Sequence, residues 1–453
     1  MIPALAGAEP RLQRRYHHLT VSQLSAFQRL AAGVHAPPTL AKGFATSQAA
    51  WRFYSNPRIG LPQLCRPLIE HACDQVPRDC QEWVLSVLDW SNLHYNGHDS
   101  KADRVELSRS NDLGYEMLTA LALSDRDGSP LAPLCLELRA KDGLHTTRSQ
   151  AALKPVSALD ALEPVMDHVL AQPLGKPVAF IIDREADSVA HYRRWEAGGK
   201  KFVVRANDHP KVLHEGRQQP LHEVAKSFGP QMQFSREVLY KGKRAGQYVA
   251  QTMVVLSRPA YEHRVGKDGR KKHKIIPGPA ITLRLVVAEV RDLKGKVLAG
   301  WLLLSNLPSC VSSCTIALWY YWRWRIESYH KLLKSAGQQV EQWQQETAAT
   351  LVRRLLVTAM SAVLVWQIAR DASPQSQQLR QVLVKLSGRQ IKRGKGSRGF
   401  TEPALLAGMG VLIPMMTLLQ EMSLEEICRA AQPLMPLIQS ITRPPRPGSG
   451  GFV

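Results

Sequence analysis

Two short apolar runs that each end on an aspartate constrain the fold of this chain most. Residues 177–183 read PVAFIID and residues 84–89 read VLSVLD, so that Asp183 and Asp89 follow runs typical of buried strands. An acid at the end of such a strand projects over the edge of the sheet, where ligands commonly bind. The alternative is that each aspartate only caps a turn. The two runs predict an α/β fold with a candidate site where two strands end.

A third acid, Glu327, lies in the segment YYWRWRIESYHKLLKSAG of residues 320–337. At about 100° per residue of a helix, Glu327 shares one narrow stripe with three other polar residues, Tyr320, Arg323 and Lys334. Arginine and lysine can hold phosphates on either side of the carboxylate. The alternative is a surface helix with an ordinary glutamate–arginine pair.

Three carboxylates in this arrangement suit a hard divalent metal ion. Mg²⁺ prefers carboxylate oxygens and completes its coordination shell with water and substrate phosphate oxygens. Two such ions about 3.5–4 Å apart can activate a nucleophile and stabilise the leaving oxygen of a phosphodiester. We therefore expect Asp89, Asp183 and Glu327 to be both the catalytic residues and the metal ligands, with Mg²⁺ as the ion and Mn²⁺ as a substitute.

The charge of the chain favours a polyanionic partner. Its 59 lysines and arginines outnumber its 38 aspartates and glutamates, which gives a net charge of +21. Basic groups that neutralise phosphates release condensed counterions, so a surplus of this size indicates nucleic acid. A membrane surface is not expected, because no basic amphipathic helix stands apart from the core pattern. The alternative is a solvated basic surface.

The cysteines and the hydropathy indicate the compartment. The seven cysteines are scattered without paired CxxC motifs, which favours a reducing cytosol over a disulfide framework or a zinc ribbon. The N-terminus lacks the pattern of a signal peptide. The apolar stretch of residues 405–419 is interrupted by glycine and proline and is too short to span a bilayer. We expect a cytoplasmic, nucleoid-associated protein.

The periodicity of apolar residues divides the chain into three regions. Residues 1–78 read as helical pieces, residues 79–370 as a catalytic domain with a β-rich insertion at about 207–300, and residues 371–453 as helices with a disordered tail. Two basic loops are expected at 263–274 and 387–399. The expected strands are 83–90, 115–124, 133–139, 177–183, 201–205, 233–240, 248–256, 281–290 and 298–304, and the expected helices are 160–171, 185–195, 314–336, 346–370, 375–386, 402–419 and 423–440.

These motifs resemble those of a known family. The pattern Tyr-x2-Arg-x3-Glu-x6-Lys, met in full by residues 320–334, is the YREK signature of the bacterial insertion-sequence-four family of DDE transposases. The sequence DREAD at 183–187 is similar to the family's motif around its second catalytic aspartate. The sequence LDWSNLHY at 88–95 is similar to the motif around the first, although Trp90 replaces a small residue. The resemblance extends to AAWRFYSNP at 49–57 and WLLLSNLP at 301–308.

The resemblance implies a ribonuclease-H-like catalytic core in which Asp89, Asp183 and Glu327 form the DDE triad. It also implies a helical N-terminal domain that binds DNA and a helical C-terminal region that forms a homodimer. The implied activity is cut-and-paste transposition, in which one strand is nicked, a hairpin forms and opens, and the end is joined to new DNA. The implied partners are duplex DNA at terminal inverted repeats and target DNA.

The resemblance further implies which residues contact DNA. It identifies Trp301 as the aromatic residue of a pocket for a flipped base, although this tryptophan could equally belong to the core of its strand. Other residues are expected to hold DNA near the ends of the element: Tyr320, Arg323, Lys334, Arg205 and Arg52. Each basic loop could follow the DNA backbone or remain solvated.

The start of the chain departs from the family pattern. It reads MIPALAGAEPRLQRRY, in which only A-E-P-R resembles the expected N-terminal motif, so we expect the first helix to be missing. A protein of that kind could act as a non-catalytic regulator or inhibitor of transposition. A structure-selective nuclease on the same scaffold is a third alternative, but the complete YREK pattern favours a transposase.

Overall fold

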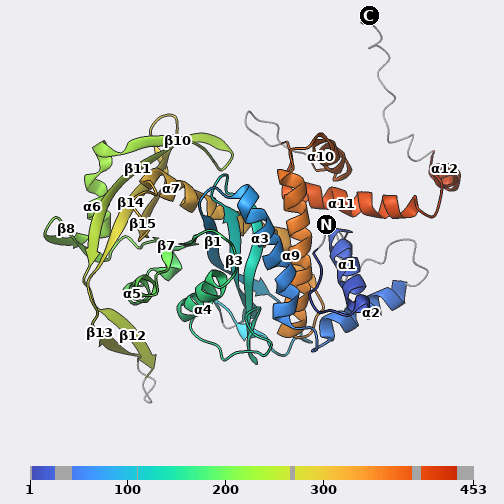
Figure 1. Cartoon of the computed structure of the whole chain (residues 1–453), viewed down its shortest axis with the longest axis horizontal. Coiled ribbons are helices and arrows are strands. Elements are labelled where there is room, and N and C mark those ends of the chain that lie inside the picture. Colours follow the sequence, from blue (N-terminus) through green and yellow to red (C-terminus); the bar gives the residue numbers. More distant parts are fainter. Residues whose placement is uncertain (1–2, 26–42, 110, 266–270, 390–398, 436–453) are drawn as a thin grey trace, which may run out of the picture.

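A computed structural model describes residues 3–25, 43–109, 111–265, 271–389 and 399–435 of the chain. In these residues the protein is a mixed α/β protein built on one 13-stranded sheet, which contains parallel and antiparallel pairs. Helices flank the sheet at both ends (Figure 1). The predicted α/β class is therefore confirmed.

The central part of the sheet is built around strand β1 (Val84–His94). On one side β1 pairs antiparallel with β3 (Leu113–Ser124), and on the other it pairs parallel with β6 (Val178–Ile182). Strand β6 in turn pairs parallel with β7 (Lys201–Arg205). Residues 84–88 and the whole of β6 are buried, as expected for strands with both faces covered. Beyond β3 the sheet continues with β4 (Pro130–Ala140) and then β5 (Gly143–Thr146). The short strand β2 (Val105–Glu106) pairs with β3.

The β-rich region of residues 207–300 extends this same sheet. Strand β15 (Val297–Ser305) pairs antiparallel with β7, and β14 (Ile281–Arg291) pairs with β15. In Figure 1 these strands continue the sheet to the left. The remaining elements of this region are β8 (Lys211–His214), β9 (Arg217–Pro220), α6 (Leu221–Ser227), β10 (Gln233–Tyr240) and β11 (Lys243–Leu256).

The prediction of a loop at 263–274 is wrong for the residues that the structure describes there. Strands β12 (Ala260–Val265) and β13 (Lys271–Ile276) form a separate two-stranded antiparallel hairpin. A polar sequence can form such a hairpin, because main-chain hydrogen bonds hold the ladder whatever the side chains are. Residues 266–270, and 390–398 of the second basic loop, lie outside the described residues.

The helices that pack on the sheet include α3 (Leu61–Asp79) and α9 (Ala348–Arg370), which both contact β4. Helix α9 is long and apolar enough to cross a membrane, but 83% of its apolar window is buried inside the protein, as in the core helix of a globular fold. The buried Arg353 of α9 donates hydrogen bonds to the carbonyl oxygens of Ile59 and Tyr54, at 2.9 and 3.1 Å. Helix α9 thereby holds the N-terminal helices.

Five further helices lie towards the two ends of the described chain. Helix α1 (Pro10–Ser25) packs against α9 and α11, and α2 (Gly43–Ser55) packs against α9. The C-terminal helices are α10 (Pro374–Leu386), α11 (Glu402–Leu418) and α12 (Leu424–Ala430). Within the described residues the helix expected at 423–440 ends early, since a 3-10 turn at Gln432–Leu434 follows α12, and residues 436–440 of that prediction lie outside the described part.

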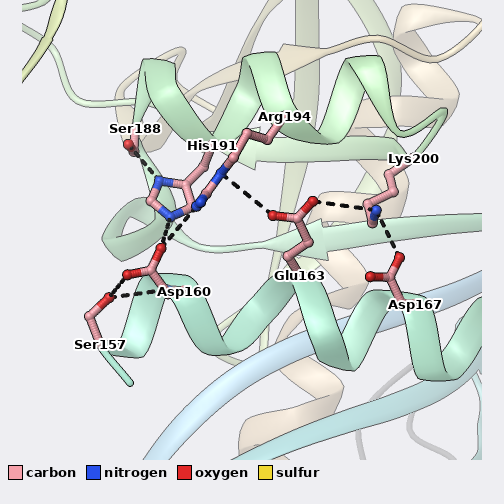
Figure 2. Close-up of polar contacts among 8 residues, drawn as sticks. All are labelled: Ser157, Asp160, Glu163, Asp167, Ser188, His191, Arg194 and Lys200. Atoms are coloured by element: carbon pink, nitrogen blue, oxygen red, sulfur yellow. Dashed lines mark hydrogen bonds and ion pairs between the residues drawn. The ribbon is translucent and has the colours of Figure 1, made fainter. Parts of the chain in front are cut away.

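Helix α5 (Val189–Ala197), which follows Asp183 in the chain, is held against α4 (Ala158–Leu170) by a polar network (Figure 2). The carboxylate of Asp160 accepts from Arg194 at 2.9 Å and lies 3.2 Å from the ring of His191. Lys200, which is buried, pairs with Asp167 at 2.8 Å. The segment after Asp183 therefore has a fixed position in the fold.

The single helix expected at 314–336 is two helices in the structure. Helix α7 (Ser313–Trp322) and helix α8 (Trp324–Leu333) are separated by a single residue, Arg323. The chain is anchored on both sides of this break. The ring of Trp322 packs on Gly128 in the turn between β3 and β4, and the side chain of Arg323 forms ion pairs with acids on two elements.

We predict that Gly128→Ala destabilises the protein more than Gly175→Ala does. Both glycines have positive φ, +68° and +71°, so each alanine costs about 1–2 kcal/mol from the backbone alone. A Cβ at Gly128 would also lie 2.4 Å from Cγ of Trp322, whereas nothing lies within 4 Å of one at Gly175. Urea unfolding measures both losses. Equal losses would contradict a tight contact between Trp322 and the turn.

Candidate active site

Two neighbouring parallel strands place Asp89 and Asp183 side by side. The last pair of the β1–β6 ladder is Leu88 with Ile182, so the two aspartates that follow occupy one rung, on strands about 4.8 Å apart. Strand β6 ends at this point, but β1 continues to His94 because β3 still pairs with it. The prediction that the first strand ends near Asp89 is therefore wrong, whereas its position beside Asp183 follows from the ladder.

One oxygen of Asp183 does cap a turn, as the alternative interpretation of this residue predicts. Its Oδ1 accepts a hydrogen bond from the backbone N–H of Glu185 at 2.8 Å, and it caps the short 3-10 helix Arg184–Ala186. No hydrogen bond to its Oδ2 is described. One carboxylate oxygen of Asp183 thus fixes the turn, and the other remains available to a ligand.

Arg323 joins Glu327 to Asp89. Its Nη1 lies 3.1 Å from Oδ2 of Asp89, and its Nη2 lies 3.1 Å from Oε1 of Glu327. Both members of the first pair are largely buried, with 8% of the arginine side chain and 13% of the aspartate side chain exposed. The guanidinium therefore lies between a carboxylate of β1 and a carboxylate of α8.

The electrostatics show that all three acids are close to one another. Burial raises the pKa of Asp89 to about 7; the charge of Arg323 opposes this shift, and the charges of Asp183 and Glu327 add to it. Glu185 belongs to the margin of the same group, because burial and the charge of Asp183 raise its pKa. The structure thus brings the three predicted acids together.

The donor chemistry of this group fits a divalent cation, because three carboxylates supply the hard oxygen ligands that Mg²⁺ prefers. Arg323 lies between Asp89 and Glu327 and contacts both. Within the described ranges, no three histidine, cysteine, aspartate or glutamate side chains are placed to hold a metal ion as they stand. Asp89, Asp183 and Glu327 are therefore suited to a cation in type and charge, while a guanidinium separates two of them.

An aromatic pair lies beside the acids. The rings of Trp301 on β15 and Tyr320 on α7 have centroids 5.7 Å apart and are tilted by 58°. Burial raises the pKa of the Tyr320 hydroxyl, and the charges of Arg323 and Arg205 oppose that shift. Trp301 is only partly buried, and it also packs against the small cluster of Val238 and its neighbours. Four of the predicted DNA contacts therefore lie together near the acids, namely Trp301, Tyr320, Arg323 and Arg205.

Lys334 lies immediately after the end of α8. Its Nζ donates a hydrogen bond to the carbonyl oxygen of Asn92 on β1 and pairs with Glu341 at 3.7 Å. Glu341 also accepts from the backbone N–H of His94 at 3.1 Å. Burial lowers the pKa of Lys334. These contacts fasten the end of α8 to the part of β1 that continues beyond the site.

Arg52 is not brought to this group. It is exposed on α2, where its described side-chain hydrogen bond is to Gln48 in the same helix, at 3.4 Å. Two residues that position the site, Gly128 and Glu341, were not predicted from the sequence. Gly128 lies between the strands expected at 115–124 and 133–139, but no local signal indicates that Trp322 packs on it. Nothing in the sequence around Glu341 indicates its bond to β1.

A search with models of protein families finds none that matches this chain.

We predict that Asp89→Asn stabilises the metal-free protein, and does so more at pH 8 than at pH 5. The folded pKa of about 7 lies above the ordinary value of 3.8, so the folded state keeps this proton while the unfolded chain loses it. Stability therefore falls as the pH rises from about 4 to about 7. Asparagine removes this loss. The gain in the free energy of unfolding that Asp89→Asn produces should therefore be about 1–3 kcal/mol larger at pH 8 than at pH 5.

Urea unfolding with a chelator present measures this difference. The control is Asp99→Asn, because 98% of the Asp99 side chain is exposed and its charge has little effect on stability. An effect of Asp89→Asn that is equal at both pH values would show that the carboxyl is not held protonated by burial.

Proposed function

We propose that this chain is a DDE transposase of the bacterial insertion-sequence-four family, an enzyme that cuts and joins DNA. The observation that carries the proposal is the convergence of Asp89, Asp183 and Glu327 beside the aromatic pair of Trp301 and Tyr320. Acids that come from two strands and a distant helix meet where a nucleobase and its phosphates could also be held.

The strand order supports the finer class of fold, a ribonuclease-H-like core. Three antiparallel strands, β4, β3 and β1, are followed by β6 and β7, which run parallel to β1. This order is typical of that fold. The β-rich insertion also lies between Asp183 and Glu327, where the sequence pattern predicts it.

We propose Asp89, Asp183 and Glu327 as the ligands of Mg²⁺, for which Mn²⁺ can substitute. Ions bound there would supply an activated water and stabilise the leaving oxygen of the phosphodiester. The chain itself supplies the position of these acids. The β1–β6 ladder fixes the two aspartates, while Trp322 and Lys334 fix the two ends of the segment that carries Glu327.

The residues around the acids fit duplex DNA as the substrate. A base that has left the stack can be held by an aromatic ring, which is the role we propose for Trp301 with Tyr320 beside it. Arg205, Arg323 and Lys334 are proposed to hold the adjacent phosphates. The net charge of +21 supports a partner of this kind. Arg52 is proposed as a DNA contact away from the acids.

The C-terminal helices support the proposed homodimer. Helix α11 has exposed apolar side chains, and a second copy of the chain could cover them. These residues are Val411, Met415 and Met416, with Leu419 directly after the helix. We propose that the protein acts in the cytoplasm at the nucleoid, on terminal inverted repeats and target DNA.

The test is to incubate the protein with Mg²⁺ and a labelled duplex that carries the inverted repeats found beside its gene. We expect nicked and hairpin products. Glu327→Gln should lower their rate at least about 100-fold, because even partners outside the ligand shell cost 10–100-fold. The control is Glu421→Gln, at an exposed glutamate outside the site, which should cut normally.

The alternative function predicts a different result. Specific binding of the repeat without any Mg²⁺-dependent product would favour a non-catalytic regulator of transposition. Cleavage that survives in Glu327→Gln would contradict the assignment of Glu327 as a ligand, and hence the triad.

A further inference from the structure

The guanidinium of Arg323 stands between the two acids that are furthest apart in the chain. It lies 3.1 Å from an oxygen of Asp89 and 3.1 Å from an oxygen of Glu327. Its charge also interacts with Asp183. In the described structure one cationic group is therefore in contact with two of the three proposed metal ligands, and close to the third.

Arg323 compensates the negative charges of Asp89 and Glu327 by direct contact. Among the described residues, no other cation contacts both acids. Asp89 is largely buried, and in its ionised form a buried carboxylate without a partner costs several kcal/mol. The nearby Lys334 is held by the carbonyl oxygen of Asn92 and by Glu341 instead. Arg323 therefore keeps the acids together when they have no other counter-ion.

The same contact opposes the binding of a metal ion. An ion shared by Asp89 and Glu327 needs the oxygens that Arg323 now holds, and two cations in one buried site repel each other strongly. This accounts for a group of acids that suits a divalent ion and yet has no set of three placed to hold one among the described residues. For the acids to close on a metal ion, the guanidinium has to leave.

The surroundings of Arg323 offer it another position. It lies at the junction of α7 and α8, with its Cζ 5.9 Å from the ring centre of Tyr320 and 5.8 Å from that of Trp324. Trp324 is 57% exposed, so its ring leads from the buried acids towards solvent. Aromatic faces attract a guanidinium, and a phosphate at this place would bind it in a bidentate manner.

We propose that Arg323 acts as a latch, which occupies the place of the cation until a DNA phosphate draws it out, so that tight metal binding requires DNA. The inference rests on the proposed function. A ligand shifts such an equilibrium only through its different affinity for the two states. Here a DNA phosphate favours the open state, in which Arg323 has left the acids. Acids without a metal ion favour the closed state, in which Arg323 contacts Asp89 and Glu327. Linkage then requires metal binding to strengthen DNA binding by the same factor.

The test measures the affinity for Mn²⁺ by calorimetric titration, with and without the inverted-repeat duplex. In the absence of DNA, Arg323→Met should bind Mn²⁺ at least about 10-fold more tightly than the unchanged protein, because the competing cation is gone. The duplex should tighten Mn²⁺ binding to the unchanged protein by a factor at least about 10-fold larger than for Arg323→Met, because phosphate oxygens add ligands in both proteins but release the latch only in the unchanged one. Titration of the duplex alone is subtracted.

Two further variants serve as controls. Lys331→Met removes the same charge from an exposed position of the same helix and should bind Mn²⁺ like the unchanged protein. Arg323→Gln replaces Arg323→Met if the latter fails to fold, as judged by its thermal unfolding, since glutamine keeps polar atoms near the acids without the charge.

The outcomes separate the latch from the proposed function. If Arg323→Met binds Mn²⁺ no more tightly than the unchanged protein, or gains as much affinity from DNA as the unchanged protein does, the latch is wrong. The proposed function then stands as long as the unchanged protein cuts DNA and Glu327→Gln weakens Mn²⁺ binding. A protein that neither binds Mn²⁺ nor cuts, with DNA or without it, would contradict both.

Discussion

The parallel pairing of β1 with β6 is the constraint on which the geometry of the acids depends. Because the ladder is in register up to Leu88 and Ile182, the next residues of both strands share one rung. A shift of one residue would send one aspartate to the opposite face of the sheet. The apolar residues of both strands are buried, and this burial holds the register. A fully buried part of the sheet therefore positions the two aspartates.

The third acid depends on contacts of another kind. Glu327 reaches the strands only because α7 and α8 are held at three points, namely Trp322 on the β3–β4 turn, Arg323 on Asp89, and Lys334 on β1. Each contact joins residues that are far apart in the chain, and the two members of the Arg323–Asp89 pair are separated by 234 positions. The site is therefore assembled by tertiary contacts at the helices and by strand pairing at the aspartates.

This difference explains how much the sequence could predict. Strands such as β6, β7 and β10 were predicted nearly to the residue, because apolar runs and alternation are local signals. The grouping of the acids and the aromatic pair followed from motifs. The break at Arg323, the continuation of β1 beyond Asp89 and the hairpin of β12 and β13 were not predicted, because distant partners or main-chain pairing decide them. For the same reason, the sequence assigned Arg323 to phosphates or to an ordinary pair with Glu327, and gave no sign of its contact with Asp89.

The junction of β7 with β15 has a consequence for how this protein could change over generations. The chain leaves the central sheet after Arg205 and returns to it at Leu303, and these two residues pair with each other. A hydrogen bond of 2.7 Å from the N–H of Ala206 to the carbonyl oxygen of Leu302 closes the gap. Nearly a hundred residues are thus attached through adjacent entry and exit points, and lengthening such an excursion costs little loop entropy. The loops of this excursion could be lengthened or shortened over generations while its strands stay packed on α7 and the acids keep their places.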